Sequence, residues 1–213
     1  MIQGITDFLH TILREFYHFS GNYGLAIILL TVLIRLVTWP LTSKQLASAK
    51  SMQELQPELK KIQEKYKGNK EKLNEETMLL WKKNKVNPVS GCLPLILQFP
   101  ILIAMFRVLE HPQRLYDTIA GFSPYFLMLD MTQQDPTYIL PILSAVTTYW
   151  QQKVMMTDKS QQMLLVMMPI MILFFSVSFQ AGLVLYWVVN NLLSVGHHLF
   201  LNRVSAKGVA DKE

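Results

Sequence analysis

The sequence predicts an all-α integral membrane protein with five transmembrane helices, a cytoplasmic antiparallel helical hairpin and an N-terminal interfacial amphipathic helix. Three observations favour this fold class. Apolar residues make up 51% of the 213 residues and charged residues only 16%. The apolar residues gather in runs long enough to cross a bilayer. The basic residues concentrate in segments that alternate with these runs, as in multi-pass membrane proteins.

Residues 1–23 are expected to form an extracytoplasmic amphipathic helix followed by a turn. Asp7 and Arg14-Glu15 interrupt the segment, which is therefore too polar to cross a bilayer and lacks the pattern of a signal peptide. Its apolar residues recur on one helical face: Ile5, Phe8, Leu9, Ile12, Leu13, Phe16 and Phe19. We expect this helix to lie along the bilayer surface.

Residues 24–42 form the first predicted span, which contains a single arginine. A charge within the bilayer costs about 2.5–3.5 kcal/mol on insertion scales, and no acidic residue lies in any apolar segment to neutralise Arg35. Thr31 and Thr38 share its helical face, because they are four and three residues away. We expect Arg35 to lie in a water-filled cavity. The alternative is a side chain that extends to the cytoplasmic headgroups.

Residues 43–90 are predicted to form the cytoplasmic hairpin. They contain eleven lysines and six glutamates, with apolar residues at helical spacing from Leu46 to Tyr66 and a turn at 67–70. We favour a role in binding, and the alternative is a solvated loop without a partner. The other spans are expected at 91–110, 137–155, 163–180 and 183–201, separated by an extracytoplasmic loop (111–136) and a cytoplasmic loop (156–162) and followed by a cytoplasmic tail (202–213).

The basic residues predict the orientation of the chain. The segments 43–90, 156–162 and 202–213 hold fifteen of the 20 basic residues, whereas 1–23 and 111–136 hold only Arg14 and Arg114. By the positive-inside rule the first group is cytoplasmic, which places the N-terminus outside and the C-terminus inside. In the loop 111–136, Phe122, Tyr125, Phe126 and Leu127 indicate a segment at the membrane interface.

Several spans carry polar residues along one face, mostly toward the cytoplasmic side. They are Thr31, Arg35 and Thr38 in the first span, Gln98 in the second, Ser144, Thr147 or Thr148, and Gln151 in the third, and Tyr186, Asn190 and Ser194 in the fifth. This pattern predicts a hydrophilic groove that is open to the cytoplasm and closed toward the exterior. The alternative for each Ser or Thr is an interhelical hydrogen bond, worth about 0.6 kcal/mol on average. Ser176 in the fourth span does not fit the pattern.

The sequence has no motif typical of an enzyme, such as a glycine-rich phosphate loop or a zinc-protease motif. His197 and His198 lack a carboxylate or cysteine at metal-ligand spacing. We therefore expect no catalytic residues, no metal and no cofactor, and a function in moving or folding another molecule.

Specific motifs extend over nearly the whole chain. They are Trp39-Pro40-Leu41-Thr42, Leu55-Gln56-Pro57, Val86-Asn87-Pro88, Gly91-Cys92-Leu93-Pro94, Gln98-Phe99-Pro100, Gln134-Asp135-Pro136 and Gly182-Leu183-Val184-Leu185-Tyr186-Trp187. Together with the arginine-bearing first span, they resemble the YidC-type membrane protein insertases (the YidC/Oxa/Alb family) in a short, Gram-positive-like form. Two departures are Trp187 and Leu102, which stand where tyrosine and an aromatic residue are common in that family.

The resemblance implies an insertase and chaperone of the bacterial plasma membrane that acts alone or beside the Sec translocon. Its clients would be newly made small membrane proteins. The ribosome, the signal recognition pathway and anionic lipids are candidate partners, and no specific nucleic acid is expected. In the family the first-span arginine lies in a hydrophilic groove and the position of Thr31 matters for function. Clients pass along the third and fifth spans, which implies roles for Phe175, Tyr186 and Trp187.

Two other classes of function remain open from the residues alone. A small anion transporter or channel subunit would carry its solute past Arg35, although no internal repeat typical of a transporter is visible. A scaffold would bind partners or anionic lipid through the hairpin, with the groove incidental.

Overall fold

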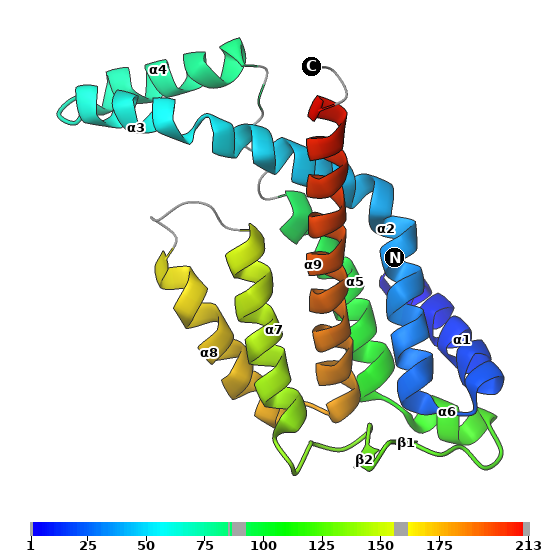
Figure 1. Ribbon diagram of the computed structural model, residues 1–213. Coiled ribbons are helices and arrows are strands. Elements are labelled where there is room, and N and C mark those ends of the chain that lie inside the picture. The colour runs from blue at the N-terminus through cyan, green and yellow to red at the C-terminus, as the bar shows by residue number, and fades with distance from the viewer. Residues whose placement is uncertain (1, 85, 87–92, 156–161, 211–213) are drawn as a thin grey trace. The chain divides into compact units, whose positions relative to one another are not determined.

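The computed structural model describes residues 2–84, 86, 93–155 and 162–210, most of which lie in α-helices (Figure 1). The helices are α1 (Ile2–Ser20), α2 (Tyr23–Glu54), α3 (Gln56–Lys65), α4 (Lys70–Lys83), α5 (Leu93–Glu110), α6 (Gln113–Thr118), α7 (Ile139–Met155), α8 (Gln162–Ser178) and α9 (Ala181–Ala210). One pair of two-residue strands, β1 (Tyr125–Phe126) and β2 (Leu129–Asp130), completes the fold. The chain forms two compact units, residues 39–98 and the remainder.

Helix α2 does not end where the sequence predicts a boundary between the first span and the hairpin. It continues through Pro40 to Glu54, although a proline inside a helix removes one backbone hydrogen bond. Leu55 separates α2 from α3, and Pro57 lies in the first turn of α3, where its missing N–H costs no helical bond. The break between the two helices therefore lies at Leu55, just before Pro57, and not at Pro40.

The unit of residues 39–98 contains α3 and α4, which pack against each other. Asn69 begins α4, with its Oδ1 accepting a hydrogen bond from the backbone N–H of Lys72 at 3.1 Å. Tyr66 donates to Glu76 Oε1 at 3.4 Å across the turn. Among the described residues of this unit, Leu55, Leu59 and Leu80 are the buried apolar ones, so the pair has a small apolar seam and many exposed charges.

In the other unit, α7 packs between α8 and α9 (Figure 1). Within the described residues, Tyr23–Glu54 and Ala181–Arg203 are long and apolar enough to cross a membrane, and Met163–Ser178 is a shorter apolar helix. Helix α8 exposes much of its apolar surface, including Met163, Ile170 and Phe174. Such a surface is unsuited to water and is typical of helices in contact with lipid or a partner.

Helix α1 is amphipathic, and its apolar face is buried against the protein. Leu9, Leu13 and Tyr17 belong to the core, whereas Phe19 is exposed. The Tyr17 hydroxyl accepts a hydrogen bond from the backbone N–H of Ser123 at 2.7 Å. The helix is thereby attached to the loop between α5 and α7.

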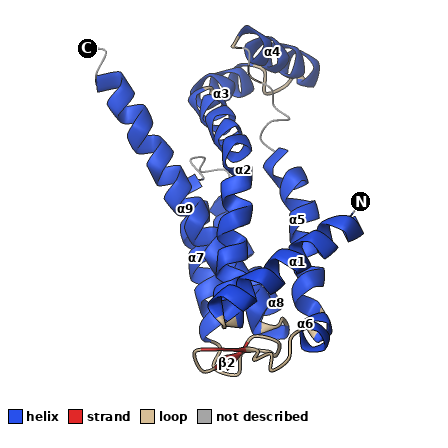
Figure 2. Cartoon of the chain, turned by 90° about the vertical axis from the view of Figure 1, so that its right-hand side faces the viewer, coloured by secondary structure: helices blue, strands red, loops and turns tan. Residues whose placement is uncertain are grey.

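That loop closes one end of the helical unit (Figure 2). The strands β1 and β2 pair antiparallel, with Tyr125 opposite Asp130. Beyond them, the carbonyl oxygens of Met131 and Gln133 accept hydrogen bonds from the N–H groups of Gly182 (2.8 Å) and Ala181 (2.7 Å). Because the first N–H groups of a helix lack partners within it, these bonds let α9 start at Ala181, two residues before the predicted span.

Two aromatic residues of the loop point inward and do not lie on its outer surface. Phe122 packs against Tyr17, Tyr23 and Tyr116, with ring centroids 4.9, 5.1 and 4.8 Å apart. Phe126 lies so close to Gly24 that a Cβ on this glycine would be 2.1 Å from Phe126 Cγ. The first residues of α2 therefore pack directly against the loop, and position 24 has no room for a side chain.

Asp135 connects the loop to α7. Its Oδ1 accepts hydrogen bonds from the N–H (2.8 Å) and hydroxyl (2.6 Å) of Thr137, and its Oδ2 accepts one from the N–H of Leu140 (2.8 Å). Burial acts to raise the pKa of the Asp135 carboxyl, but these hydrogen bonds outweigh it and hold the pKa below its ordinary value of 3.8. The ionised carboxylate therefore stabilises the first turn of α7.

We expect Asp135→Asn to lower the free energy of unfolding in detergent by about 1 kcal/mol at neutral pH, because the new amide N cannot accept from Leu140. The folded-state pKa is depressed, so the stabilisation is present above the ordinary pKa of 3.8 and is lost as the pH falls through the lower folded value. Thermal unfolding of both proteins across this range measures the difference. Asp130→Asn is the control, since Asp130 makes the same contacts to Thr132 but holds no helix N–H. An equal loss in both variants would contradict the helix-capping role.

Candidate functional site: an arginine between two helices and a neighbouring apolar cavity

Arg35 reaches from α2 to α9. Its Nη2 donates hydrogen bonds to the backbone carbonyl of Asn190 at 3.1 Å and to the hydroxyl of Ser194. Its Nε is buried and has no hydrogen-bond partner among the described residues, and no ion pair to Arg35 is present in that part of the chain. Among the described residues, the guanidinium is thus held by two neutral acceptors, without a counter-charge and with the Nε donor still available.

Other residues of the predicted groove lie in the same two helices as Arg35 and its acceptors. Thr31 is buried and its hydroxyl donates to the carbonyl of Ile27 in its own helix, at 2.7 Å. Thr38 donates to the carbonyl of Ile34 at 2.8 Å. Tyr186, on α9, is buried and near enough to Arg35 to interact with it electrostatically. Asn190 contributes its backbone carbonyl to Arg35.

The polar residues of α7 are engaged in hydrogen bonds between helices. The Thr148 hydroxyl accepts from the indole N–H of Trp187 at 3.0 Å and from the amide of Asn191 at 2.9 Å, both on α9. The Ser144 hydroxyl lies 2.9 Å from that of Ser176 on α8. Interhelical bonding, the alternative left open by the sequence, accounts for these residues and explains Ser176 as the partner of Ser144.

Neighbouring residues of α9 therefore contact two different helices, α2 and α7. Asn190 and Ser194 face Arg35, whereas Trp187 and Asn191 face α7. Each residue of an α-helix is rotated by about 100° from the one before it, so adjacent positions occupy different faces. Helix α9 thus takes part in both sets of contacts, those with α2 and those with α7.

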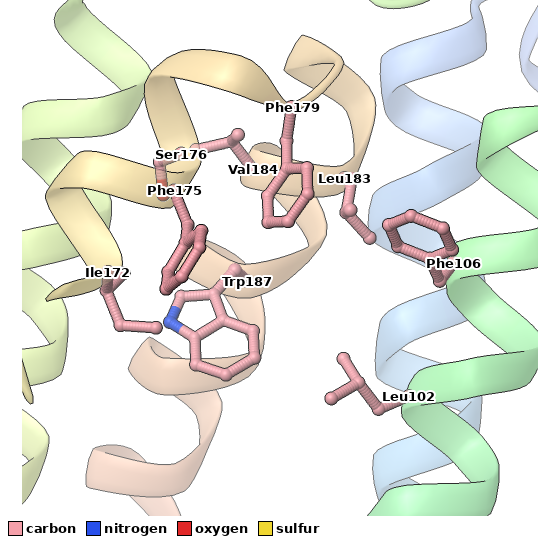
Figure 3. A pocket seen from close by; sticks show the side chains of 9 residues that line it. All are labelled: Leu102, Phe106, Ile172, Phe175, Ser176, Phe179, Leu183, Val184 and Trp187. Carbon is pink, nitrogen blue, oxygen red and sulfur yellow. The ribbon is translucent and has the colours of Figure 1, made fainter.

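An apolar cavity of about 330 Å³ lies between α5, α8 and α9 (Figure 3). Its lining consists of Leu102, Phe106, Ile172, Phe175, Ser176, Phe179, Leu183, Val184 and Trp187. In Figure 3 the rings of Phe175 and Trp187 stand next to each other, opposite Leu102 and Phe106. The cavity can accept an apolar side chain but offers few polar contacts.

The cavity contains residues that the sequence analysis did not select. Phe106 and Phe179 pack edge to face at 5.8 Å, and Phe179 stacks on Phe175 at 6.4 Å. The signal was present in the sequence as pairs four residues apart: Leu102 with Phe106, Phe175 with Phe179, and Leu183 with Trp187. Aromatic residues in apolar spans are common, so this spacing alone is a weak indicator.

Gln151 and Gln98 are the remaining predicted groove residues. Gln151, in α7, is partly buried. Gln98 is in α5, but its side chain lies outside the described residues, as do residues 87–92 with their two motifs. Within the described part of the chain, no group of three or more His, Cys, Asp or Glu side chains could hold a metal ion.

The family model described as "60Kd inner membrane protein" matches residues 15–208. The chain belongs to this YidC-type family. The Bacillus subtilis membrane protein insertase MisCA is 47% identical over 185 residues, which cover 83% of this chain and 69% of that protein. The Helicobacter pylori membrane protein insertase YidC is 43% identical over 197 residues.

A solved structure of the YidC family has the same fold. The crystal structure titled "Active YidC insertase crystal structure with the first transmembrane domain resolved" has a TM-score of 0.71 and 26% identity, and the match covers 91% of this chain and 45% of that one. The Helicobacter pylori alignment covers 91% of this chain but 35% of the longer protein. The chain thus spans about a third of the length of such YidC relatives.

Proposed function

We propose that this protein is a membrane protein insertase and chaperone, and that the site around Arg35 is where its clients are received. Family membership supports the activity. The observation that carries the assignment of the site is that, among the described residues, Asn190 and Ser194 hold Arg35 while its buried Nε has no partner. A cation kept at this cost in an apolar helix calls for a function, and attraction of a client's acidic groups supplies one.

We further propose that the chain crosses the bacterial plasma membrane five times, with α2, α5, α7, α8 and α9 as spans. The helices α3 and α4 then form the cytoplasmic hairpin, and the loop between α5 and α7 lies outside with the N-terminus. The positive-inside rule supports this orientation, because residues 43–90 hold most of the lysines. The hairpin is the proposed docking site for clients, ribosome or targeting factors, and anionic lipid is its proposed membrane partner.

In the proposed mechanism a hydrated groove shortens the apolar path for the polar tail of a client. At 4 Å, two opposite charges attract by about 1 kcal/mol in water and about 4 kcal/mol at the effective dielectric constant near a protein surface. Arg35 would thus draw an acidic tail toward α9. Thr31, Thr38, Gln98, Gln151, Tyr186 and Asn190 are proposed to line its path.

The apolar part of the client is proposed to move past the cavity of Phe175 and Trp187. Trp187 and Asn190 are three residues apart, so the cavity and the Arg35 contact are separated by about 4.5 Å along α9. Polar and apolar parts of one client segment can therefore engage both at once. Transfer of the apolar segment into lipid provides the driving force, without nucleotide hydrolysis.

Reconstitution of the purified chain into proteoliposomes tests the function. A single-span client with an acidic tail, synthesised in their presence, should become protected from external protease, and empty liposomes should not protect it. Flux of small anions without client insertion would instead identify a transporter. Loss of function on deleting residues 46–84, combined with normal insertion by Arg35→Ala, would identify a scaffold.

A further inference from the structure

The turn between β1 and β2 exposes a short apolar tip. Leu127 and Met128 are 85% and 92% exposed, and Tyr125 beside them is 56% exposed. Phe126 and Leu129, which lie opposite each other in the two strands, pack against the core. The β1–β2 segment thus has an inner face that packs on the core and an outer apolar face that no described residue covers.

The backbone at this tip is one that leucine seldom adopts. Leu127 has a φ of 54° and Tyr138 a φ of 59°, and they are the two non-glycine residues with positive φ in the described chain. Glycine, asparagine or aspartate usually occupies such positions, because those residues tolerate the left-handed conformation. Here both positions carry large side chains that are more than half exposed. Retaining them against the backbone preference indicates that the side chains themselves are used.

The surroundings of the tip match a membrane interface. Tyr116, Tyr125 and Tyr138 are all exposed in this loop region, and tyrosine is enriched where a bilayer meets water. Residues 119–129 contain no charge. The first turns of α7, which follow this loop in the chain, also expose apolar residues, Ile139 and Ile142. Figure 2 places the strands at the end of the helical unit.

We propose that the Leu127–Met128 tip, with Tyr125 and Tyr138, inserts into the lipid surface of the outer leaflet. This inference rests on the proposed topology, which puts the loop outside. Lipid is favoured over a protein partner because the exposed tip is apolar, exposed tyrosines lie in the same loop region, and residues 119–129 carry no charge that would select a partner. Backbone carbonyls of the same loop accept hydrogen bonds from the first N–H groups of α9. Lipid contact at the tip would therefore also hold the start of α9 in position.

Fluorescence in proteoliposomes tests the proposal. With Cys92→Ser removing the single native cysteine, Met128→Cys is labelled with a polarity-sensitive NBD probe, and Asp117→Cys, an exposed residue of α6, is the matched control. The probe at 128 should emit at shorter wavelength than the probe at 117, be quenched by lipids brominated on their acyl chains and resist aqueous iodide. Water-like emission with the same iodide quenching at both sites would overturn the proposal and assign the tip to water or to a protein partner.

A second variant guards against an effect of the label on the turn. Leu127→Asn combined with Met128→Gly suits the turn backbone and makes the tip polar. A probe at Tyr125→Cys should move to longer wavelength in this background, and an unchanged spectrum would contradict lipid insertion. Because no client is present, these readouts are independent of insertase activity. A protein that fails the insertion test can still pass this one.

Discussion

Replacing Arg35 by alanine is expected to reduce insertion of an acidic-tailed client by about tenfold or more, while Arg35→Lys retains most of it. Loss of an attraction of about 1.4 kcal/mol already gives a tenfold change, and charge attraction in a partly desolvated site exceeds that value. Protease protection in proteoliposomes, with matched clients carrying acidic or neutral tails, measures the effect. The neutral-tailed client should respond much less.

The control for Arg35 is Ser194→Ala, which removes an acceptor of the guanidinium but leaves the charge. The Ser194 hydroxyl also donates to the Asn190 carbonyl within α9 at 2.7 Å, and that carbonyl remains available to Arg35. Insertion by this variant should stay close to that of the unmodified protein. If Ser194→Ala fails as severely as Arg35→Ala, the arginine acts by holding α2 to α9 and not by attracting clients.

Replacing Gly182 by alanine is expected to lower the free energy of unfolding by about 1–3 kcal/mol, the usual cost of overpacking. The added Cβ would lie 2.9 Å from the carbonyl oxygen of Met131 and 3.1 Å from Ile27 Cδ1. The carbonyl belongs to backbone that accepts the Gly182 N–H, so it cannot move away without breaking that bond. Thermal unfolding in detergent measures the loss.

Gly196→Ala is the matched control, because it lies in the same helix with nothing within 4 Å of the added Cβ. Alanine is the better helix former by about 1 kcal/mol, so this variant should be as stable as the original or more so. Equal destabilisation by both substitutions would show that α9 merely tolerates alanine poorly, and the proposed clash with the loop would be wrong.

The helices could be predicted because their signals are local. The apolar residues of α1 recur at helical spacing along several turns, so neighbouring residues suffice to indicate the helix. The all-helical class was right apart from the four strand residues of β1 and β2. Their pairing depends on a turn at Leu127–Met128, which has none of the residues that usually mark a hairpin.

The site was only partly predictable because its contacts depend on which residue of one helix meets which residue of another. Periodicity placed Thr148 on a polar face, but Thr148 proved to be a partner of Trp187 and Asn191. Spacing placed Arg35 in an apolar span, yet it could not select the carbonyl of Asn190 as the acceptor. The role of these residues in receiving clients stays a prediction.

The hydrogen bond from Trp187 to Thr148 makes the shape of the apolar cavity depend on a residue that does not line it. Helix α7 contributes no side chain to that lining, but Thr148 fixes the plane of the largest ring in it. A substitution in α7 that removes this hydrogen bond is therefore expected to change the shape of the cavity while every lining residue stays the same. Relatives with identical linings can differ in the shape of this cavity.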